Sequence, residues 1–217
     1  MRALLINANT TAAITARMAG LLRARLPDGC EIVEATGRFG APYISTPQDY
    51  ERGADAALDA LERNPGCDVV MLGCFGDPGL DRLRAASPAP VIGMASAACV
   101  AAARIGRFSI VTGGAHWPAM LTPLVERIGL GARLASVRAT TLTGAEIAAD
   151  PETALAALAA CVTACADDGA QVVILGGAGL AGLAEPLRPR CVVALIDSLD
   201  AMGEAAAAAL NGGAHVA

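Results

Sequence analysis

The chain has 217 residues, a formal net charge of −5, and a composition that is 54% hydrophobic but only 3% aromatic. This length fits one large domain or two domains of about 100 residues each. The basic residues are scattered, which argues against a nucleic-acid partner, and no apolar run reaches the roughly 18 residues of a membrane span. No apolar segment long enough for a signal peptide follows the N-terminus, so we expect a cytoplasmic protein without a membrane partner.

The residue types present exclude several kinds of chemistry. All 16 basic residues are Arg, and the lack of Lys excludes Schiff-base, pyridoxal phosphate and P-loop lysine chemistry. The seven Cys form no C-x-x-C pair and the chain has only two His, so we expect no metal site.

Strand and helix signals alternate along the first half of the chain. Short apolar runs predict parallel strands that are covered on both faces, and longer Ala- and Leu-rich segments predict helices. We expect strands at 2–6, 31–35, 69–72 and 90–94, and helices at 10–26, 47–64, 77–86 and 96–103.

The same order of elements then begins again. We expect strands at 108–111, 134–138, 172–175 and 192–196, and helices at 117–128, 151–167, 180–187 and 197–210, with a frayed tail at 211–217. The fold class is therefore α/β, with two Rossmann-like lobes whose parallel sheets are related by a pseudo-twofold. We expect residues 1–98 and 198–217 to form the first lobe, and residues 99–197 to form the second.

One segment occurs twice and differs where chemistry would lie. Residues 68–80 align with residues 171–183, with seven of thirteen pairs identical, and Cys74 of the first copy corresponds to Gly177 of the second. Ligands of parallel α/β sheets bind beyond the carboxyl ends of the strands. The turns at 7–10, 73–77, 112–115 and 176–179 lie there, so we expect the active site in the cleft between the lobes.

Cys74 is the residue with the clearest chemical potential. It follows a predicted strand and precedes a predicted helix, and a helix N-terminus lowers the pKa of a thiol and favours the thiolate. Such a thiolate is a base or a nucleophile; the alternative is a structural cysteine in a tight turn. The backbone N–H groups of Phe75, Gly76, Ala178 and Gly179 could hold an oxyanion or a carboxylate, although glycine-rich turns are also common without a ligand.

Small polar residues follow the first strand of each half. Asn7, Asn9, Thr10 and Thr112 suit a small polar ligand, and the alternative role for them is helix N-capping. His116, just beyond the turn that contains Gly113 and Gly114, could assist a proton transfer or bind a carboxylate, or could simply be an exposed histidine at a helix start.

Three further titratable residues are interpreted differently. Asp77 and Asp197 precede predicted helices and are interpreted first as N-caps. His215 lies in the tail and is discounted.

Together these turns supply the set of residues from which we expect substrate contacts, in addition to catalytic Cys74: Asn7, Asn9, Thr10, Phe75, Gly76, Thr112, Gly113, Gly114, His116, Gly177, Ala178 and Gly179.

The sequence resembles the aspartate/glutamate/hydantoin racemase superfamily, and is most similar to its hydantoin and allantoin racemase branch. The resemblance is carried by the runs Ile6-Asn-Ala-Asn-Thr10, Gly73-Cys-Phe-Gly-Asp-Pro-Gly-Leu80, Ser136-Val-Arg138 and Val193-Ala-Leu-Ile-Asp197. It implies a homo-oligomeric enzyme without metal or cofactor, acting on a small carboxylate or hydantoin-like substrate. Two cysteines would remove and return the α-proton on opposite faces of the substrate, and Cys74 matches the first of them.

The second cysteine of that scheme falls on Gly177, and Met94-Ala-Ser96 replaces the Glu-containing segment usual in hydantoin racemases. Three interpretations remain open. The first is a racemase or isomerase in which water or His116 serves the second face. The second is a single-cysteine decarboxylase similar to arylmalonate decarboxylases, with Cys74 as the proton donor. The third is a non-catalytic binder of small molecules.

Overall fold

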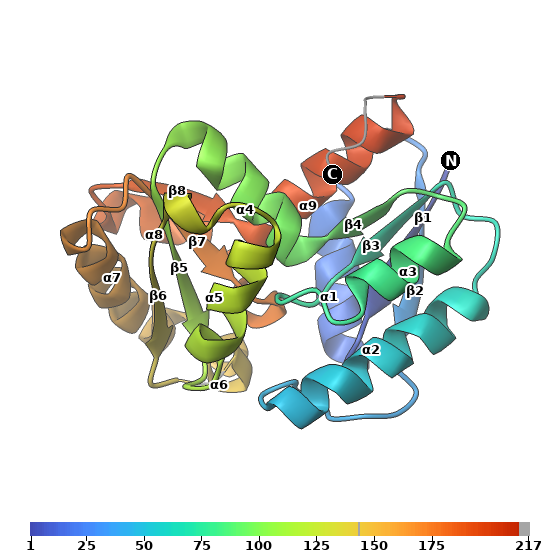
Figure 1. The fold of residues 1–217 in the computed structure, drawn as a ribbon, viewed down its shortest axis with the longest axis horizontal. Coiled ribbons are helices and arrows are strands. Elements are labelled where there is room, and N and C mark those ends of the chain that lie inside the picture. The colour runs from blue at the N-terminus through green and yellow to red at the C-terminus, as the bar shows by residue number, and fades with distance from the viewer. Residues whose placement is uncertain (143, 213–217) are drawn as a thin grey trace. The chain divides into compact units, whose positions relative to one another are not determined.

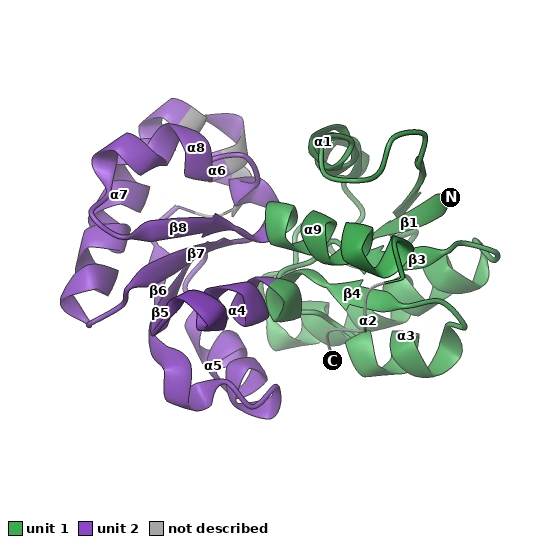
Figure 2. Ribbon diagram, turned by 90° about the horizontal axis from the view of Figure 1, so that it is seen from above, with its two compact units in different colours: residues 1–97, 199–217 green, residues 98–198 purple. Residues whose placement is uncertain are grey.

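A computed structural model describes residues 1–142 and 144–212. Thr143 and residues 213–217, including His215, lie outside the described residues. The chain divides into two compact units, residues 1–97 with 199–217 and residues 98–198 (Figure 2). Within the described residues, none of the helices combines the length and the apolarity that crossing a membrane would require.

The first unit is built on a four-stranded parallel sheet in the order β2-β1-β3-β4 (Figure 1). In Figure 2, α1 and α9 cover one face of this sheet, and α2 and α3 cover the other. The strands are β1 (Arg2–Asn7), β2 (Glu31–Thr36), β3 (Val69–Leu72) and β4 (Val91–Gly93), and the helices are α1 (Ala12–Leu22), α2 (Pro47–Glu62), α3 (Leu80–Ala86) and α9 (Ser198–Leu210).

The second unit repeats this arrangement with the strand order β6-β5-β7-β8, again parallel. Its strands are β5 (Phe108–Gly113), β6 (Leu134–Thr140), β7 (Val172–Gly176) and β8 (Ala194–Asp197), and its helices are α4 (Met94–Ile105), which begins in the first unit, α5 (Trp117–Arg127), α6 (Gly144–Ala149), α7 (Pro151–Asp167) and α8 (Ala184–Leu187). Short 3-10 turns occur at η1 (Gly131–Arg133), η2 (Ala178–Leu180) and η3 (Arg188–Arg190). The predicted α/β class with two parallel sheets is therefore confirmed.

Both copies of the internal repeat occupy the same place in their sheets. β3 and β7 each lie beside the first strand of their unit, in register with β1 and β5 respectively. Every residue of the two strands is buried, which explains their continuous apolar sequences. The turns that follow them therefore leave equivalent strand ends.

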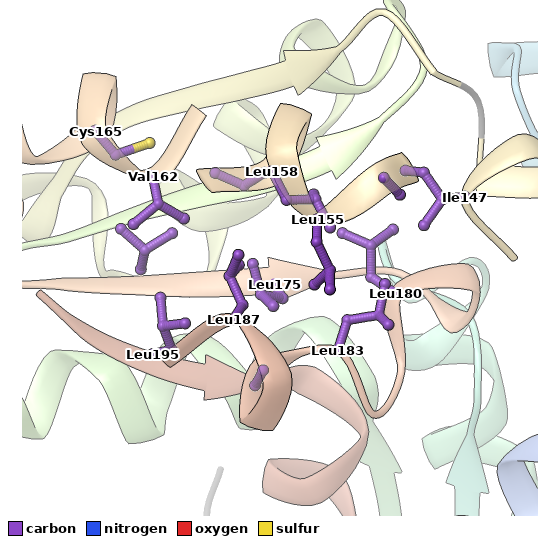
Figure 3. Close-up of a cluster of buried hydrophobic side chains, with 14 of the residues drawn as sticks. Ile147, Leu155, Leu158, Val162, Cys165, Leu175, Leu180, Leu183, Leu187 and Leu195 are labelled. Atoms are coloured by element: carbon purple, nitrogen blue, oxygen red, sulfur yellow. The ribbon is translucent and has the colours of Figure 1, made fainter. Parts of the chain in front are cut away.

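The core of the second unit fixes the turn after β7. Leu155 and Leu158 of α7 point towards Leu175 of β7 and Leu180 of η2 (Figure 3). The Leu180 side chain is almost completely buried in this cluster. Burial of one such side chain stabilises the fold by about 1.5–3 kcal/mol. The buried Leu180 side chain therefore anchors the C-terminal end of the turn that follows β7.

Several helix boundaries differ from those predicted. The helix expected at 77–86 begins at Leu80 because Gly76, Asp77 and Gly79 have positive φ angles of 122°, 55° and 73°. Residues with a positive φ do not continue a right-handed helix, so the helix begins only after Gly79.

The helix expected at 180–187 is divided in the same way. It splits into η2 and α8, and Gly182 with a φ of 82° lies at the break. The strand expected at 192–196 shifts to Ala194–Asp197, which leaves Val192 exposed.

Candidate functional site

Cys74 lies in a tight turn at the carboxyl end of β3. The N–H of Gly73 donates to the carbonyl of Ile6 at 2.8 Å, and the N–H of Asp77 donates to the carbonyl of Cys74 at 3.1 Å. The first bond ties the turn to β1, and the second closes it. The side chain of Cys74 is only 7% exposed.

The ionisation of Cys74 differs from the sequence-based expectation. Burial, and secondly the negative charge of Asp77, raise the pKa of the Cys74 thiol to about 12. The predicted lowering of this pKa is wrong, because α3 begins six residues after Cys74 and the helix end does not adjoin the sulfur. The resting form of Cys74 at neutral pH is therefore the thiol, which is a proton donor.

Two backbone donors follow the thiol directly. Phe75 and Gly76 are both buried, and within the described chain their N–H groups have no acceptor. Buried N–H groups are nearly always paired. A negatively charged or carbonyl oxygen of a ligand would satisfy them.

The Cys74 turn is held by a residue that the sequence reasoning missed. The hydroxyl of Tyr50, on α2, donates to the carbonyl of Gly76 at 2.8 Å and lies 3.3 Å from the carbonyl of Asp77. Only the rarity of tyrosine, two in the chain, could have drawn attention to it.

Asp77 caps a helix, but not the one that follows it in sequence. Its carboxylate accepts hydrogen bonds from the N–H of Ala95 at 2.9 Å and from the N–H and hydroxyl of Ser96 at 2.7 and 2.6 Å. The capped helix is thus α4 rather than α3, which corrects the prediction from sequence order. Asp197 similarly accepts from the N–H of Gly182 at 2.6 Å, in the turn after β7.

The polar residues after β1 form a closed internal network. The side-chain amide of Asn7 lies 2.9 Å from Asn9 Oδ1 and 3.0 Å from Thr15 Oγ1, and Asn7 Oδ1 accepts from the N–H of Asn9. Asn9 Oδ1 also accepts from the N–H of Thr11. Asn7 is fully buried, so its visible role is to shape this turn. Thr10 is half-buried, and its N–H donates to the carbonyl of Ala41.

The counterpart turn after β7 has a different backbone. Gly177 has φ 135° and ψ 145°, a conformation that residues with a side chain rarely adopt. A Cβ placed on it would lie 3.5 Å from Leu180 Cδ1 and 3.9 Å from Thr112 Oγ1, which are ordinary contacts. Space for a side chain exists, but the backbone favours glycine.

Two hydroxyl groups border Gly177. Thr112, at the end of β5, is 3% exposed and pairs with Gly176 across the sheet. Ser198 Oγ accepts from the Gly177 N–H at 3.4 Å, a contact that brings together residues 21 positions apart and that the sequence did not reveal. Ala178 and Gly179 begin η2, one half-buried and the other buried.

The remaining predicted site residues lie around the end of β5. Gly113 is the last residue of that strand, and Gly114 follows it with a φ of 99°. His116 is exposed at the N-cap position of α5, and its side chain makes no capping bond.

The fold and the Cys74 turn define an α/β protein with two parallel-sheet units and a proton-bearing thiol at a strand end. The chain belongs to the Asp/Glu/hydantoin racemase family, whose model matches residues 4–206.

Individual relatives agree with this assignment. A hydantoin racemase from Paenarthrobacter aurescens is 32% identical over 207 residues, covering 93% of this chain and 87% of the relative. Allantoin racemase from Pseudomonas fluorescens has a TM-score of 0.94 at 31% identity, covering 100% of this chain and 94% of that structure. Arylmalonate decarboxylase, with a TM-score of 0.68 at 18% identity over 99% of this chain and 94% of that structure, shares the fold.

Proposed function

We propose that the protein is a cofactor-independent racemase or isomerase that exchanges the proton α to a carbonyl in a hydantoin-type or small carboxylate substrate, with Cys74 as acid and base. The observation that carries this proposal is the Cys74 turn, where a buried thiol is followed by two N–H groups without an internal acceptor among the described residues. Family membership and the similarity to hydantoin and allantoin racemases support it.

The chemistry would proceed through an enolate. The Cys74 thiolate accepts the α-proton, and the C–H electron pair moves onto the carbonyl oxygen, which the N–H groups of Phe75 and Gly76 stabilise. Return of a proton from Cys74 restores the original configuration, whereas a proton from the opposite face inverts it. In the two-cysteine scheme that face belongs to position 177, which is glycine here, so water or His116 would have to deliver the proton.

The pH dependence follows from the resting state of the thiol. Because the pKa of Cys74 is raised to about 12, only a small fraction is thiolate at neutral pH. The rate of α-proton abstraction should therefore rise with pH until that value is approached.

The test is proton NMR in D₂O with 5-substituted hydantoins, allantoin, aspartate and glutamate. Wild type should introduce deuterium at the α-carbon, and Cys74→Ala should lose about 10²-fold or more of this rate. Cys67→Ala, which removes a half-buried thiol from the same unit, is the matched control and should retain it. Deuteration that persists unchanged in Cys74→Ala would remove this residue from the mechanism.

A decarboxylase is the second candidate, because Cys74 rests as a proton donor and position 177 carries no thiol. Loss of CO₂ from a malonate-type substrate leaves an enediolate; the Cys74 thiol donates its proton to the α-carbon, and water then reprotonates the sulfur. The rate of decarboxylation should fall as pH approaches the pKa of Cys74, whereas the rate of α-proton exchange should rise.

Aryl- and alkylmalonates in the same NMR assay test this candidate. Saturable binding of a small molecule without either reaction would indicate a binder.

A further inference from the structure

Asp77 is a buried carboxylate in the same turn as Cys74, and the proposed mechanism does not use it. It is 1% exposed, and the three hydrogen bonds that its oxygens accept come from the first turn of α4. All three partners are donors, so the geometry suits the charged carboxylate rather than the protonated acid.

Two backbone features accommodate this contact. Among the described residues, Asp77 is the one non-glycine with a positive φ, 55°, a conformation that costs free energy unless the surroundings maintain it. Gly93, at the end of β4, lies so close that an added Cβ would be 2.5 Å from the Asp77 carboxyl. Any larger residue at position 93 would displace the carboxylate.

Asp77 acts on Cys74 in two ways, through its backbone and through its carboxylate. The N–H of Asp77 closes the turn onto the Cys74 carbonyl, and its negative charge adds to burial in raising the pKa of the thiol. The other groups that face Asp77 are the neutral hydroxyl of Ser96 and, at longer range, the guanidinium of Arg84 on α3. Burial raises the pKa of the Asp77 carboxyl, and the donors from Ser96 and Ala95 oppose that effect.

We propose that Asp77 is a positioning residue for Cys74: anchored to the first turn of α4, it fixes the Cys74 turn and holds a negative charge beside the thiol. The inference deepens the proposed function of Cys74 and rests on it for its catalytic meaning. The effect of the Asp77 charge on the reactivity of the Cys74 thiol can be measured without any substrate.

The experiment is alkylation with iodoacetamide in short pulses between pH 7 and 12.5, a range that extends past the raised pKa of the Cys74 thiol, followed by peptide mass spectrometry. Cleavage after Arg63 and Arg82 releases one peptide that contains both Cys67 and Cys74, and fragment ions distinguish the two sulfurs. Asp77→Asn removes the charge with little change of shape. The Cys74 alkylation rate at pH 8.5 should rise on the order of tenfold, and its levelling-off should move to lower pH, while the rate of Cys67 stays the same.

Two further variants separate charge from loosening of the turn. Asp81→Asn removes an equal charge from an exposed position on α3 and should leave Cys74 unchanged. Ser96→Ala weakens the same anchor but keeps the carboxylate, so any rise in rate should come without a shift in the pH profile. An unshifted profile in Asp77→Asn, or an equal shift in Ser96→Ala, would overturn the proposal. The alkylation assay uses no substrate, so its result stands even if the protein shows no α-proton exchange. A failure of this proposal can therefore be distinguished from a failure of the proposed function.

Discussion

At the scale of single residues, Gly177 differs from its counterpart in the repeat, Cys74, in backbone conformation as well as in side chain. Gly177 has a φ of 135°, whereas the φ of Cys74 is not positive, since Asp77 is the one non-glycine with a positive φ in the described chain. The two copies of the repeat have therefore diverged in backbone as well as in side chain. A thiol restored at 177 would have room but would also carry strain.

Gly177→Cys tests this directly when it is compared with Gly177→Ala. Both variants should lose about 1–3 kcal/mol of stability from the unfavourable backbone conformation, measured by denaturant unfolding. In the proposed mechanism only a cysteine at 177 would supply an acid for the second face, so we expect Gly177→Cys to invert hydantoins faster than Gly177→Ala. Circular dichroism of the substrate measures the inversion. Equal inversion rates in the two variants would contradict the two-cysteine scheme, in which position 177 serves the second face of the substrate.

At the scale of elements, α2 contributes to the site through its first turn. Thr46 and Asp49 form a reciprocal capping box, with each side chain accepting from the other's N–H at 3.1 Å. This fixes the start of the helix and places Tyr50 within reach of the Gly76 carbonyl. A local sequence signal thus positions a long-range contact.

Tyr50→Phe should weaken the Cys74 turn without altering α2. It leaves the Gly76 carbonyl without its hydroxyl donor, which costs about 1–3 kcal/mol for a buried acceptor, and it should lower the rate of α-proton exchange. Tyr43→Phe is the matched control, because Tyr43 is 39% exposed, and it should change neither property. Thermal unfolding and the NMR exchange assay measure the two effects; wild-type values in Tyr50→Phe would show that the turn does not depend on this bond.

At the scale of the whole molecule, the first unit is completed by the C-terminal helix. The chain leaves this unit after residue 97 and returns at residue 199, where α9 packs against α1 and its C-terminal continuation. Asp200 accepts two hydrogen bonds from the Arg25 guanidinium, at 2.8 and 2.7 Å, and a Cβ on Gly203 would lie 2.8 Å from Arg25 Cβ and 2.9 Å from Leu22 Cδ2. Close approach of the two segments therefore requires glycine at 203.

Gly203→Ala should destabilise the protein by about 1–3 kcal/mol through overpacking, although alanine favours helices. Gly20→Ala, on the exposed side of α1 with only Arg23 Nη1 at 4.0 Å, should instead stabilise it by about 0.5–1 kcal/mol. Denaturant unfolding of both variants provides the comparison. A stabilised Gly203→Ala would show that α9 can move away from α1 at little cost.

The sequence predicted correctly that Cys74 and Gly177 follow the ends of strands, but it did not predict how the Cys74 thiol ionises. Cys74 and Gly177 occupy the expected strand-end turns because the repeat aligns β3 with β7. The raised pKa of Cys74 could not be predicted, because burial and the proximity of Asp77 are properties of the folded chain. Tyr50 and Ser198 were missed for the same reason, since each contacts its turn across more than twenty residues.

By itself, the sequence determined the α/β class, the two parallel sheets and the family, because continuous apolar runs, alternating elements and a repeated motif are written in the order of residues. Only the tertiary structure decided where α3 begins, which helix Asp77 caps and how the Cys74 thiol ionises. Those properties depend on backbone angles, desolvation and contacts between segments distant in sequence, and such quantities come into existence when the chain packs.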